Sequence, residues 1–344
     1  METIVARRVK QSLENLLKEA VFKAKKSGQL EFDILPEVNL EIPKEKAHGN
    51  FSSNLALLLS KAAKKPPREI AQILVSNFES NSYVKEAQIA GPGFINFYLN
   101  DSWLGEVLAS ILEQKEDYGN NSDLNGKKIQ LEFVSANPVG PMNVVNARAA
   151  ALGDTLSRLF KACGARVEKE YYINDYGVQV QTLGRSLDAR YRQLLGEKVD
   201  FPEDGYQGEY ITEMAREIIE TEGDSYLKLP EEKRIETFSD LGCRRILASQ
   251  KQDLLNYGVE YDCWFSERSL HETGEVEKVL ETLEKRGLIF ESEAAVWLRT
   301  TDFGDDKDRV LKTSDGRTTY FTADIAYHLN KFQRGFDLAI NIWG

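Results

Sequence analysis

Hydrophobic residues at the start of the chain recur every three or four positions. The repeat runs through Val5, Val9, Leu13, Leu16 and Leu17. This spacing places apolar side chains on one face of a helix. We therefore expect an amphipathic helix over residues 1 to about 30, with this stripe buried. No uninterrupted apolar run in the chain reaches the roughly 18 residues that a membrane-spanning helix needs.

Short periodic segments separated by polar turns follow this helix. The alternation predicts strands at residues 38–42, 84–89 and 94–99. Helices are expected at 55–65, 67–78 and 102–115, with Ser52 or Ser53 capping the first of them. The polar stretch 120–126 is typical of a linker. The pattern thus predicts a compact α+β domain over residues 1–118, in which His48 is a turn residue.

A second pattern begins at Leu131, where an apolar run leads into a turn containing Pro138, Gly140 and Pro141. An alanine-rich helix and a second apolar strand, at 167–173, follow. Strand, helix and strand at this spacing predict a parallel βαβ unit. Because ligands of parallel α/β sheets bind at the carboxyl ends of the strands, the loop after the first strand is the place to expect chemistry.

The remainder of the chain is predicted to be mostly helical between residues 179 and 288. This stretch is expected to form a helical insertion at about 185–294, with Ile218, Ile246, Leu254 and Leu255 facing its core. Trp264 and His271 are interpreted as packing or capping residues. A strand at 295–299, a helix at 320–333 and a buried strand at 337–343 complete the prediction.

Charge and cysteine content narrow the class of protein. The net charge of −11 argues against non-specific binding of nucleic acid by the whole surface. Residues 1–118 carry 15 Lys and Arg against 16 Asp and Glu, so almost all of the negative charge lies in the rest of the chain. Three widely spaced cysteines without a CxxC pair argue against a disulfide framework or a zinc site, and favour the reducing cytoplasm.

Several long words in the second part of the chain resemble one enzyme family. They read EFVSANPVGPMNVVNARAAALGD, EKEYYINDYGVQV and GDDKDRVLKTSDGRTTYFTADIAYHLNKFQRGFD, in this order. The first resembles the opening signature of class I aminoacyl-tRNA synthetases, and together they resemble arginyl-tRNA synthetase. The words HGNFSSNLAL, KPPREIAQIL and AGPGFINFYL resemble the additional N-terminal domain of that family, which contacts tRNA.

The resemblance implies a fold and a reaction. Residues 1–118 would be the α+β tRNA-contacting domain, and residues 119–344 the first part of a Rossmann-type class I catalytic domain with its helical insertion. The implied reaction joins arginine to tRNA, with ATP and Mg, through an arginyl-adenylate. The family's arginine-binding roles fall on Asp324 and Tyr320 for the guanidinium, and on Glu132 and Asn137 for the other polar contacts. A carboxylate suits a guanidinium because the two can pair through two hydrogen bonds.

The nucleotide-binding part of the first signature departs from the family pattern. The family has His-x-Gly-His or His-x-Gly-Asn, and this chain has Asn143, Val144, Val145 and Asn146. Asparagine cannot supply the positive charge of the first histidine. Val145 would fill the space that glycine leaves for the adenine. Asn143 and Asn146 are therefore the positions expected to contact ATP, and we expect them to stabilise it less than the residues of the family signature do.

The family also continues beyond the position of residue 344, into a lysine-bearing loop and an anticodon-binding domain. Two hypotheses follow. The chain belongs to an arginine-charging enzyme, with a second chain as one source of the C-terminal half. Alternatively, it is a non-catalytic paralogue that binds arginine, tRNA or a protein partner. A dinucleotide oxidoreductase is disfavoured, because no glycine-rich phosphate loop follows a strand.

A basic cluster in the first domain is the candidate contact for tRNA. It consists of Lys61, Lys64, Lys65 and Arg68 at the junction of two predicted helices. Such residues contact the phosphate backbone of an RNA without reading its bases. The competing interpretation is an ordinary solvated helix surface.

Overall fold

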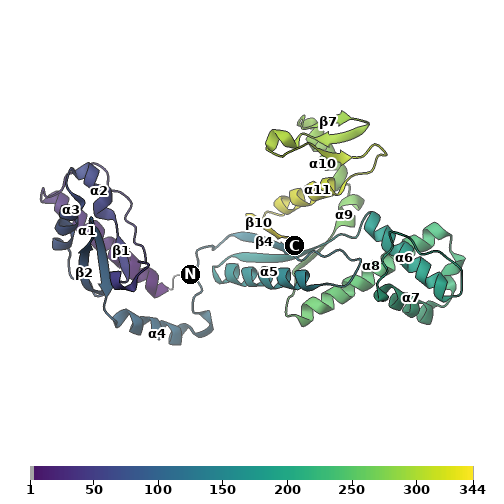
Figure 1. The fold of residues 1–344 in the computed structure, drawn as a ribbon, viewed down its shortest axis with the longest axis horizontal. Helices are drawn as coiled ribbons and strands as arrows, with labels where there is room; N and C mark the ends of the chain where they lie inside the picture. Colours follow the sequence, from purple (N-terminus) through teal and green to yellow (C-terminus); the bar gives the residue numbers. More distant parts are fainter. Residues whose placement is uncertain (1–3, 344) are drawn as a thin grey trace. The chain divides into compact units, whose positions relative to one another are not determined.

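The computed structural model describes residues 4–343, which fall into two compact units (Figure 1). The first unit ends at Asn121 and the second begins at Ser122. Each unit has a hydrophobic core of its own. Among the helices of residues 4–343, none has the length and hydropathy that crossing a membrane requires.

The first unit packs helices on a small antiparallel sheet. Its strands are β1 (Phe51–Ser53), β2 (Val84–Ala90) and β3 (Phe94–Leu99), in the order β1-β3-β2. Its helices are α1 (Ile4–Lys26), α2 (Leu55–Ala63), α3 (Pro67–Ser76) and α4 (Ser102–Gln114), with short 3-10 turns at Lys46–His48 and Lys115–Asp117. The five apolar residues that predicted the first helix are all buried in this core.

The strand predicted at residues 38–42 is wrong. Val38 and Leu40 are buried, as the alternation required. The backbone, however, forms only a single bridge between Glu41 and Ser52, and the paired strand at this place is β1. The N-cap of α2 is Asn54 rather than a serine, although the Ser53 hydroxyl does accept a hydrogen bond from the Leu55 amide at 3.3 Å.

The second unit is built on a four-stranded parallel sheet in the order β10-β4-β5-β6. The strands are β4 (Lys128–Phe133), β5 (Arg166–Ile173), β6 (Cys263–Ser266) and β10 (Leu338–Ile342). The predicted parallel βαβ unit is confirmed, because β4 pairs with β5 in parallel and α5 (Val144–Ala162) connects them. Helix α11 (Tyr320–Gln333) lies on the opposite face of the sheet from α5 (Figure 1).

A series of helices follows β5 along the chain, while the insertion at about 185–294 stays a prediction. They are α6 (Val178–Leu194), α7 (Glu209–Glu222), α8 (Glu231–Asn256), α9 (Glu267–Glu272) and α10 (Glu275–Lys285), with a 3-10 turn at Ser225–Lys228. Ile218, Ile246 and Leu254 are buried as predicted, but Leu255 is exposed. Leu254 and Leu255 are neighbours on α8, so their side chains point in different directions, and only Leu254 faces the core.

The prediction of a mostly helical stretch from 179 to 288 is wrong at β6. This strand pairs in parallel with β5, so Trp264 belongs to the main sheet and stacks on Tyr171 with 4.4 Å between ring centroids. A run of four residues is too short to show a period of two among helices. A separate antiparallel sheet follows, with strands β7 (Ile289–Ser292), β8 (Ala295–Leu298) and β9 (Arg309–Lys312) and a 3-10 turn at Thr300–Phe303.

Helix α5 approaches β4 closely because one of its buried residues is glycine. A β-carbon added to Gly153 would lie 2.1 Å from Cγ of the Phe133 ring, far inside van der Waals contact. Phe133 is fully buried and is the last residue of β4. The glycine thus sets the distance between α5 and the strand that leads into the candidate site.

We expect Gly153→Ala to lower the free energy of unfolding of the second unit by about 1–3 kcal/mol, the usual cost of overpacking. Alanine has the higher helix propensity, so steric crowding must outweigh a gain of up to about 1 kcal/mol. Gly105→Ala in α4 is the matched control, since no atom lies within 4 Å of its added β-carbon. Urea unfolding followed by circular dichroism measures both, and equal stability of the Gly153 variant and the parent would contradict the prediction.

Candidate functional site

The backbone that leaves β4 is strained. Val134 and Ser135 have φ angles of 70° and 41°, a region that costs a residue other than glycine about 1–3 kcal/mol. The strain places the Ser135 hydroxyl between two strands, where it donates to Glu132 Oε1 at 3.0 Å and accepts from the Tyr172 amide at 3.1 Å. Residues held in this way are frequent at binding sites.

Polar side chains fix the loop after this turn by hydrogen bonds to its backbone. The Tyr171 hydroxyl and the Ala136 backbone exchange hydrogen bonds of 3.1 Å. The Gln250 amide donates to the carbonyls of Asn137 and Gly140 at 3.2 and 3.0 Å. The Asn137 side chain donates to Gln179 Oε1 at 2.7 Å, so its own carbonyl oxygen remains available as an acceptor.

Glu132 is buried and forms an ion pair with a lysine that the sequence analysis did not single out. Lys331 of α11 is fully buried, and its Nζ lies 2.6 Å from Glu132 Oε2. The same ammonium donates to Asn341 Oδ1 of β10 at 2.7 Å. Burial lowers the pKa of Lys331, against the opposing effect of Glu132. Lys331 follows Asp324 by two helical turns on α11, and no local pattern in the sequence marks it as buried.

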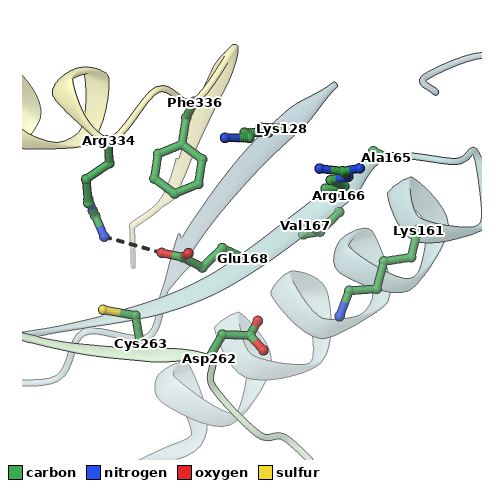
Figure 2. Close-up of a pocket in the computed structure, with 10 residues that line it drawn as sticks. All are labelled: Lys128, Lys161, Ala165, Arg166, Val167, Glu168, Asp262, Cys263, Arg334 and Phe336. Atoms are coloured by element: carbon green, nitrogen blue, oxygen red, sulfur yellow. Dashed lines mark hydrogen bonds and ion pairs between the residues drawn. The ribbon is translucent and has the colours of Figure 1, made fainter. Parts of the chain in front are cut away.

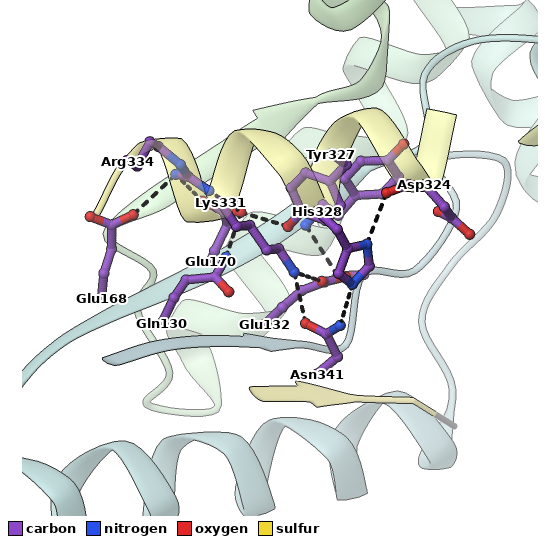
Figure 3. A network of polar contacts seen from close by, with 12 residues as sticks. Gln130, Glu132, Glu168, Glu170, Asp324, Tyr327, His328, Lys331, Arg334 and Asn341 are labelled. Carbon is purple, nitrogen blue, oxygen red and sulfur yellow. Dashed lines mark hydrogen bonds and ion pairs between the residues drawn. The ribbon is translucent and has the colours of Figure 1, made fainter. Parts of the chain in front are cut away.

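A second acidic side chain is paired next to the first one. Glu170 of β5 is the register partner of Glu132. Arg334 donates to both of its carboxylate oxygens, at 2.5 and 2.9 Å, and the Tyr327 hydroxyl adds a contact of 2.5 Å. Burial alone would raise the pKa of Glu170, but these hydrogen bonds hold it below its usual value. Figure 3 shows both ion pairs between α11 and the sheet.

Asp324 lies on α11 nearer the carboxyl ends of the strands. Its carboxylate points away from the buried network in Figure 3, and it forms no ion pair with any residue in 4–343 for which a contact is described. Its side chain keeps an exposed surface, yet partial burial raises the pKa of Asp324; Glu132 raises it further, while His328 and Lys331 oppose the rise. Tyr320, four residues earlier on the same helix face, is 79% exposed.

A third carboxylate of the site was missed by the sequence analysis. Glu267 begins α9, directly after β6, and is buried. Burial raises the pKa of Glu267 to about 7; a hydrogen bond from Tyr172 opposes this, and the charges of Asp324 and Asp175 add to it. The signal was hidden because the sequence analysis interpreted this strand as helix, so Glu267 was not recognised as the residue at the carboxyl end of a strand.

The signature positions at the start of α5 form a capping box. The Asn143 side chain accepts hydrogen bonds from the amides of Val145 and Asn146, at 2.9 and 3.3 Å. The Asn146 side chain accepts from the Asn143 amide at 2.9 Å. These bonds satisfy amides that a helix N-terminus otherwise offers to an anion. Val145 is 51% exposed on the first turn.

The basic cluster of the first unit lies at the end of α2 and the start of α3. Lys65 pairs with Glu69, and Arg68 donates to the Gly91 carbonyl at 3.0 Å. Lys61 and Lys64 are exposed, and no side-chain hydrogen bond or ion pair of either is among the contacts described for residues 4–343. The backbone of Lys64 is left-handed, with φ at 51°. Two of the four cations are thus engaged with protein groups.

A pocket formed by the described residues lies elsewhere, at the amino ends of β4, β5 and β6. It has a volume of about 830 Å³, and Lys128, Arg166, Glu168, Cys263 and Arg334 contribute to its lining (Figure 2). Burial raises the pKa of the Cys263 thiol to about 12, so it stays protonated. Arg334 already occupies the nearby carboxylates. We prefer the candidate site at the carboxyl ends of the strands, because the strained loop and the three carboxylates converge there.

Comparison with known sequence families assigns both units. The profile described as arginyl tRNA synthetase N terminal domain matches residues 7–99. The profile described as tRNA synthetases class I (R), catalytic domain matches residues 107–342. Between them they account for most of the chain.

Individual relatives agree with the profiles. The chain is 47% identical over 338 residues to an arginine–tRNA ligase of Syntrophotalea carbinolica, covering 98% of this chain and 61% of the relative. It is 49% identical over 321 residues to that of Carboxydothermus hydrogenoformans, covering 93% of this chain and 58% of the relative. The chain thus spans about three fifths of the length of these curated relatives.

Solved structures give the same result for the fold. A putative arginyl-tRNA synthetase of Campylobacter jejuni superposes with a TM-score of 0.65 at 38% identity, over 72% of this chain and 54% of that one. The Thermus thermophilus arginyl-tRNA synthetase superposes with a TM-score of 0.61 at 23% identity, over 93% and 52%, and supports the fold alone. The present chain therefore belongs to the arginyl-tRNA synthetase family of class I aminoacyl-tRNA synthetases, as its sequence, its N-terminal α+β unit and its parallel sheet together show.

Proposed function

We propose that the carboxyl edge of the parallel sheet binds arginine, as the amino-acid half of an arginine–tRNA ligase site. The observation that carries this proposal is the group of carboxylates at that edge. Glu132, Glu267 and Asp324 come from three different elements, and their charges influence one another. Lys331 compensates only one of them. An excess of negative charge in a partly buried place attracts a cationic ligand.

The guanidinium group of arginine is assigned to Asp324. This carboxylate is free of an ion pair within the described part of the chain, and an Arg–carboxylate pair with two hydrogen bonds is the strongest contact it could make. Glu267 lies close enough to Asp324 to change its charge state, and Tyr320 shares its helix face. These three side chains form the guanidinium end of the proposed pocket.

The amino-acid head group is assigned to Glu132 and Asn137. Each oxygen of Glu132 has one partner, Ser135 or Lys331, and a carboxylate oxygen can accept a second hydrogen bond. The Asn137 carbonyl oxygen is a further acceptor for an ammonium. Asn137 follows directly on the strained turn, so the fold itself fixes its position.

The nucleotide half of the site is proposed to be weak in this chain. The family substrate is ATP with Mg, and its phosphates would meet the start of α5. Asn143 and Asn146 turn their oxygens to the helix amides, and each keeps only its amide NH2 group for a phosphate. Loss of one donor to developing charge typically costs about 3 kcal/mol of transition-state stabilisation. Arginyl-adenylate formation by the chain alone should therefore be slow or absent.

This weakness favours the second hypothesis, in which the chain binds arginine or tRNA without catalysis. Binding of tRNA would then involve the first unit, where the ammonium groups of Lys61 and Lys64 could contact phosphates. Lys65 and Arg68 could do so only by giving up their present contacts with Glu69 and the Gly91 carbonyl. We place the function in the cytoplasm. The proposal needs no second chain, for which the comparisons give no support.

Replacing Asp324 by alanine should weaken arginine binding about ten- to hundredfold. A hydrogen bond to a charged group is worth about 1.5–3 kcal/mol, which corresponds to that range in the dissociation constant. Isothermal titration calorimetry with arginine measures the effect. Asp315→Asn, at an exposed acid in the turn before α11, is the control and should bind as the parent does. Equal binding by the Asp324 variant would remove this residue from the site.

Arginine binding should strengthen between pH 6 and pH 8, because Glu267 ionises with a pKa of about 7. The ionised carboxylate attracts the guanidinium, and the protonated one does not. Glu267→Gln should make the affinity nearly independent of pH in this range. A parent and a variant with the same pH profile would contradict the assignment of Glu267.

The same ionisation has the opposite effect on folding. The folded-state pKa of about 7 lies above the usual 4.5 of glutamate, so the folded chain holds a proton that the unfolded chain has released. Stability should therefore fall as the pH rises from about 4.5 to beyond 7. Glu267→Gln should reduce this fall in urea unfolding experiments, which gives a check that does not depend on arginine.

Asn143→His combined with Val145→Gly should raise the affinity for ATP, since it restores a donor and opens the space beside the backbone. Asn143→His with Val144→Gly has the same composition but puts glycine at the position that varies in the family pattern, so it is the matched control. Calorimetry with Mg·ATP measures binding.

Arginine-dependent ATP–pyrophosphate exchange, with tRNA present, should be absent in the parent, and clear exchange above a no-enzyme background would refute the proposed weakness.

A further inference from the structure

Lys331 is a fully buried cation whose contacts are all internal. Its ammonium donates to Glu132 Oε2 at 2.6 Å and to Asn341 Oδ1 at 2.7 Å, and lies 4.1 Å from the centroid of the Tyr327 ring. An ammonium has three protons to donate, and these three partners account for them. Lys331 therefore cannot reach a ligand, and any effect on binding must act through its partners.

The hydrogen bonds around Asn341 fix the direction of this network. The Asp324 carbonyl can only accept, so His328 Nδ1 donates to it across 2.9 Å. His328 Nε2 then accepts from the Asn341 NH2 group at 2.8 Å, which leaves the Asn341 oxygen for Lys331. The directions follow from the requirement that each contact has one donor and one acceptor. Lys331 is thereby joined both to the Glu132 carboxylate and to the backbone of Asp324 (Figure 3).

The charges of the proposed pocket differ between its two ends. At the head-group end, Glu132 and Lys331 sum to zero. At the other end, the Asp324 carboxylate has no compensating ion pair among the residues described. Arginine has the matching distribution, because its ammonium and carboxylate cancel at one end and its guanidinium carries a single positive charge at the other. The corresponding amine without the carboxylate, agmatine, would bring an extra positive charge to the neutral end.

We propose that Lys331 is a specificity-determining residue, which selects an α-amino acid over the amine of the same side chain by neutralising Glu132. Without Lys331, the buried Glu132 charge would favour a ligand with two positive charges. With it, the ligand carboxylate meets no excess of negative charge. This inference rests on the proposed arginine site and adds the basis on which that site distinguishes the head group of its ligand.

The test compares arginine with agmatine by calorimetry in four proteins and one control variant. They are the parent, Lys331→Met, Glu132→Gln and the double variant. Lys285→Met in α10 serves as a control, because it removes an exposed lysine that pairs with Glu281 in its own helix. Circular dichroism establishes that each protein is folded. The measured quantity is the ratio of the two dissociation constants, which general weakening of a damaged site does not change.

The expected shifts have opposite signs. The parent and the Lys285 variant should prefer arginine. Lys331→Met should shift the ratio toward agmatine by about tenfold or more, since an uncompensated charge lies within a few ångströms of the ligand in a poorly screened place. Glu132→Gln should shift the ratio further toward arginine, because Lys331 is then in excess. The double variant should return to a ratio near that of the parent.

The possible results separate the role of Lys331 from the arginine site itself. An unchanged ratio in both single variants, even with weaker binding, would overturn the role of Lys331 and leave the arginine site standing. Failure of the parent to bind either ligand would overturn the proposed function together with this inference. If Lys331→Met does not fold, the sign of the shift in Glu132→Gln decides alone, and a shift toward agmatine would refute the proposal.

Discussion

The buried ion pair between Glu132 and Lys331 is the contact on which the candidate site depends. A charge removed from water is tolerated only when it is paired and its remaining hydrogen-bonding capacity is satisfied. Here the Ser135 hydroxyl donates to the other oxygen of Glu132, and the Asn341 side-chain oxygen accepts a hydrogen bond from the Lys331 ammonium. The pair fixes the register of α11 against β4. Asp324, two helical turns before Lys331, is thereby placed at the carboxyl edge of the sheet.

A second ion pair, between Arg334 and Glu170, further restricts how α11 can lie against the sheet. Glu132 and Glu170 face each other across β4 and β5, and two like charges in such positions repel. Lys331 and Arg334 are three residues apart, so they share a helix face and each meets one of the acids. Rotating or sliding α11 would leave two buried carboxylates without cations, and breaking one buried pair typically costs about 3–5 kcal/mol. The sheet and the helix therefore specify each other.

The sequence predicts those parts of the fold that show a long and regular pattern. Helix α11 was predicted with the same ends that the structure has, because fourteen residues of helical periodicity follow a polar turn. Strand β6 escaped prediction because four residues among helices show no period, and Glu267 was missed with it. A lysine in a helix is normally exposed, so the burial of Lys331 follows only from the acids that the sheet places opposite it. Tertiary charge pairing of this kind is not visible in local periodicity.

The two ends of the site differ in how strongly the fold constrains them. The proposed arginine end rests on two buried side chains, Glu132 and Lys331, and a substitution at either would leave a partner charge uncompensated. The proposed nucleotide end is an exposed first turn, in which Asn143 acts as a helix cap worth about 1 kcal/mol. Changing this turn alters ligand contacts without destabilising the core. Substitutions in the signature can therefore accumulate without disturbing the buried residues of the proposed amino-acid pocket, and Asn143 caps α5 through the same amides that an anion would otherwise use.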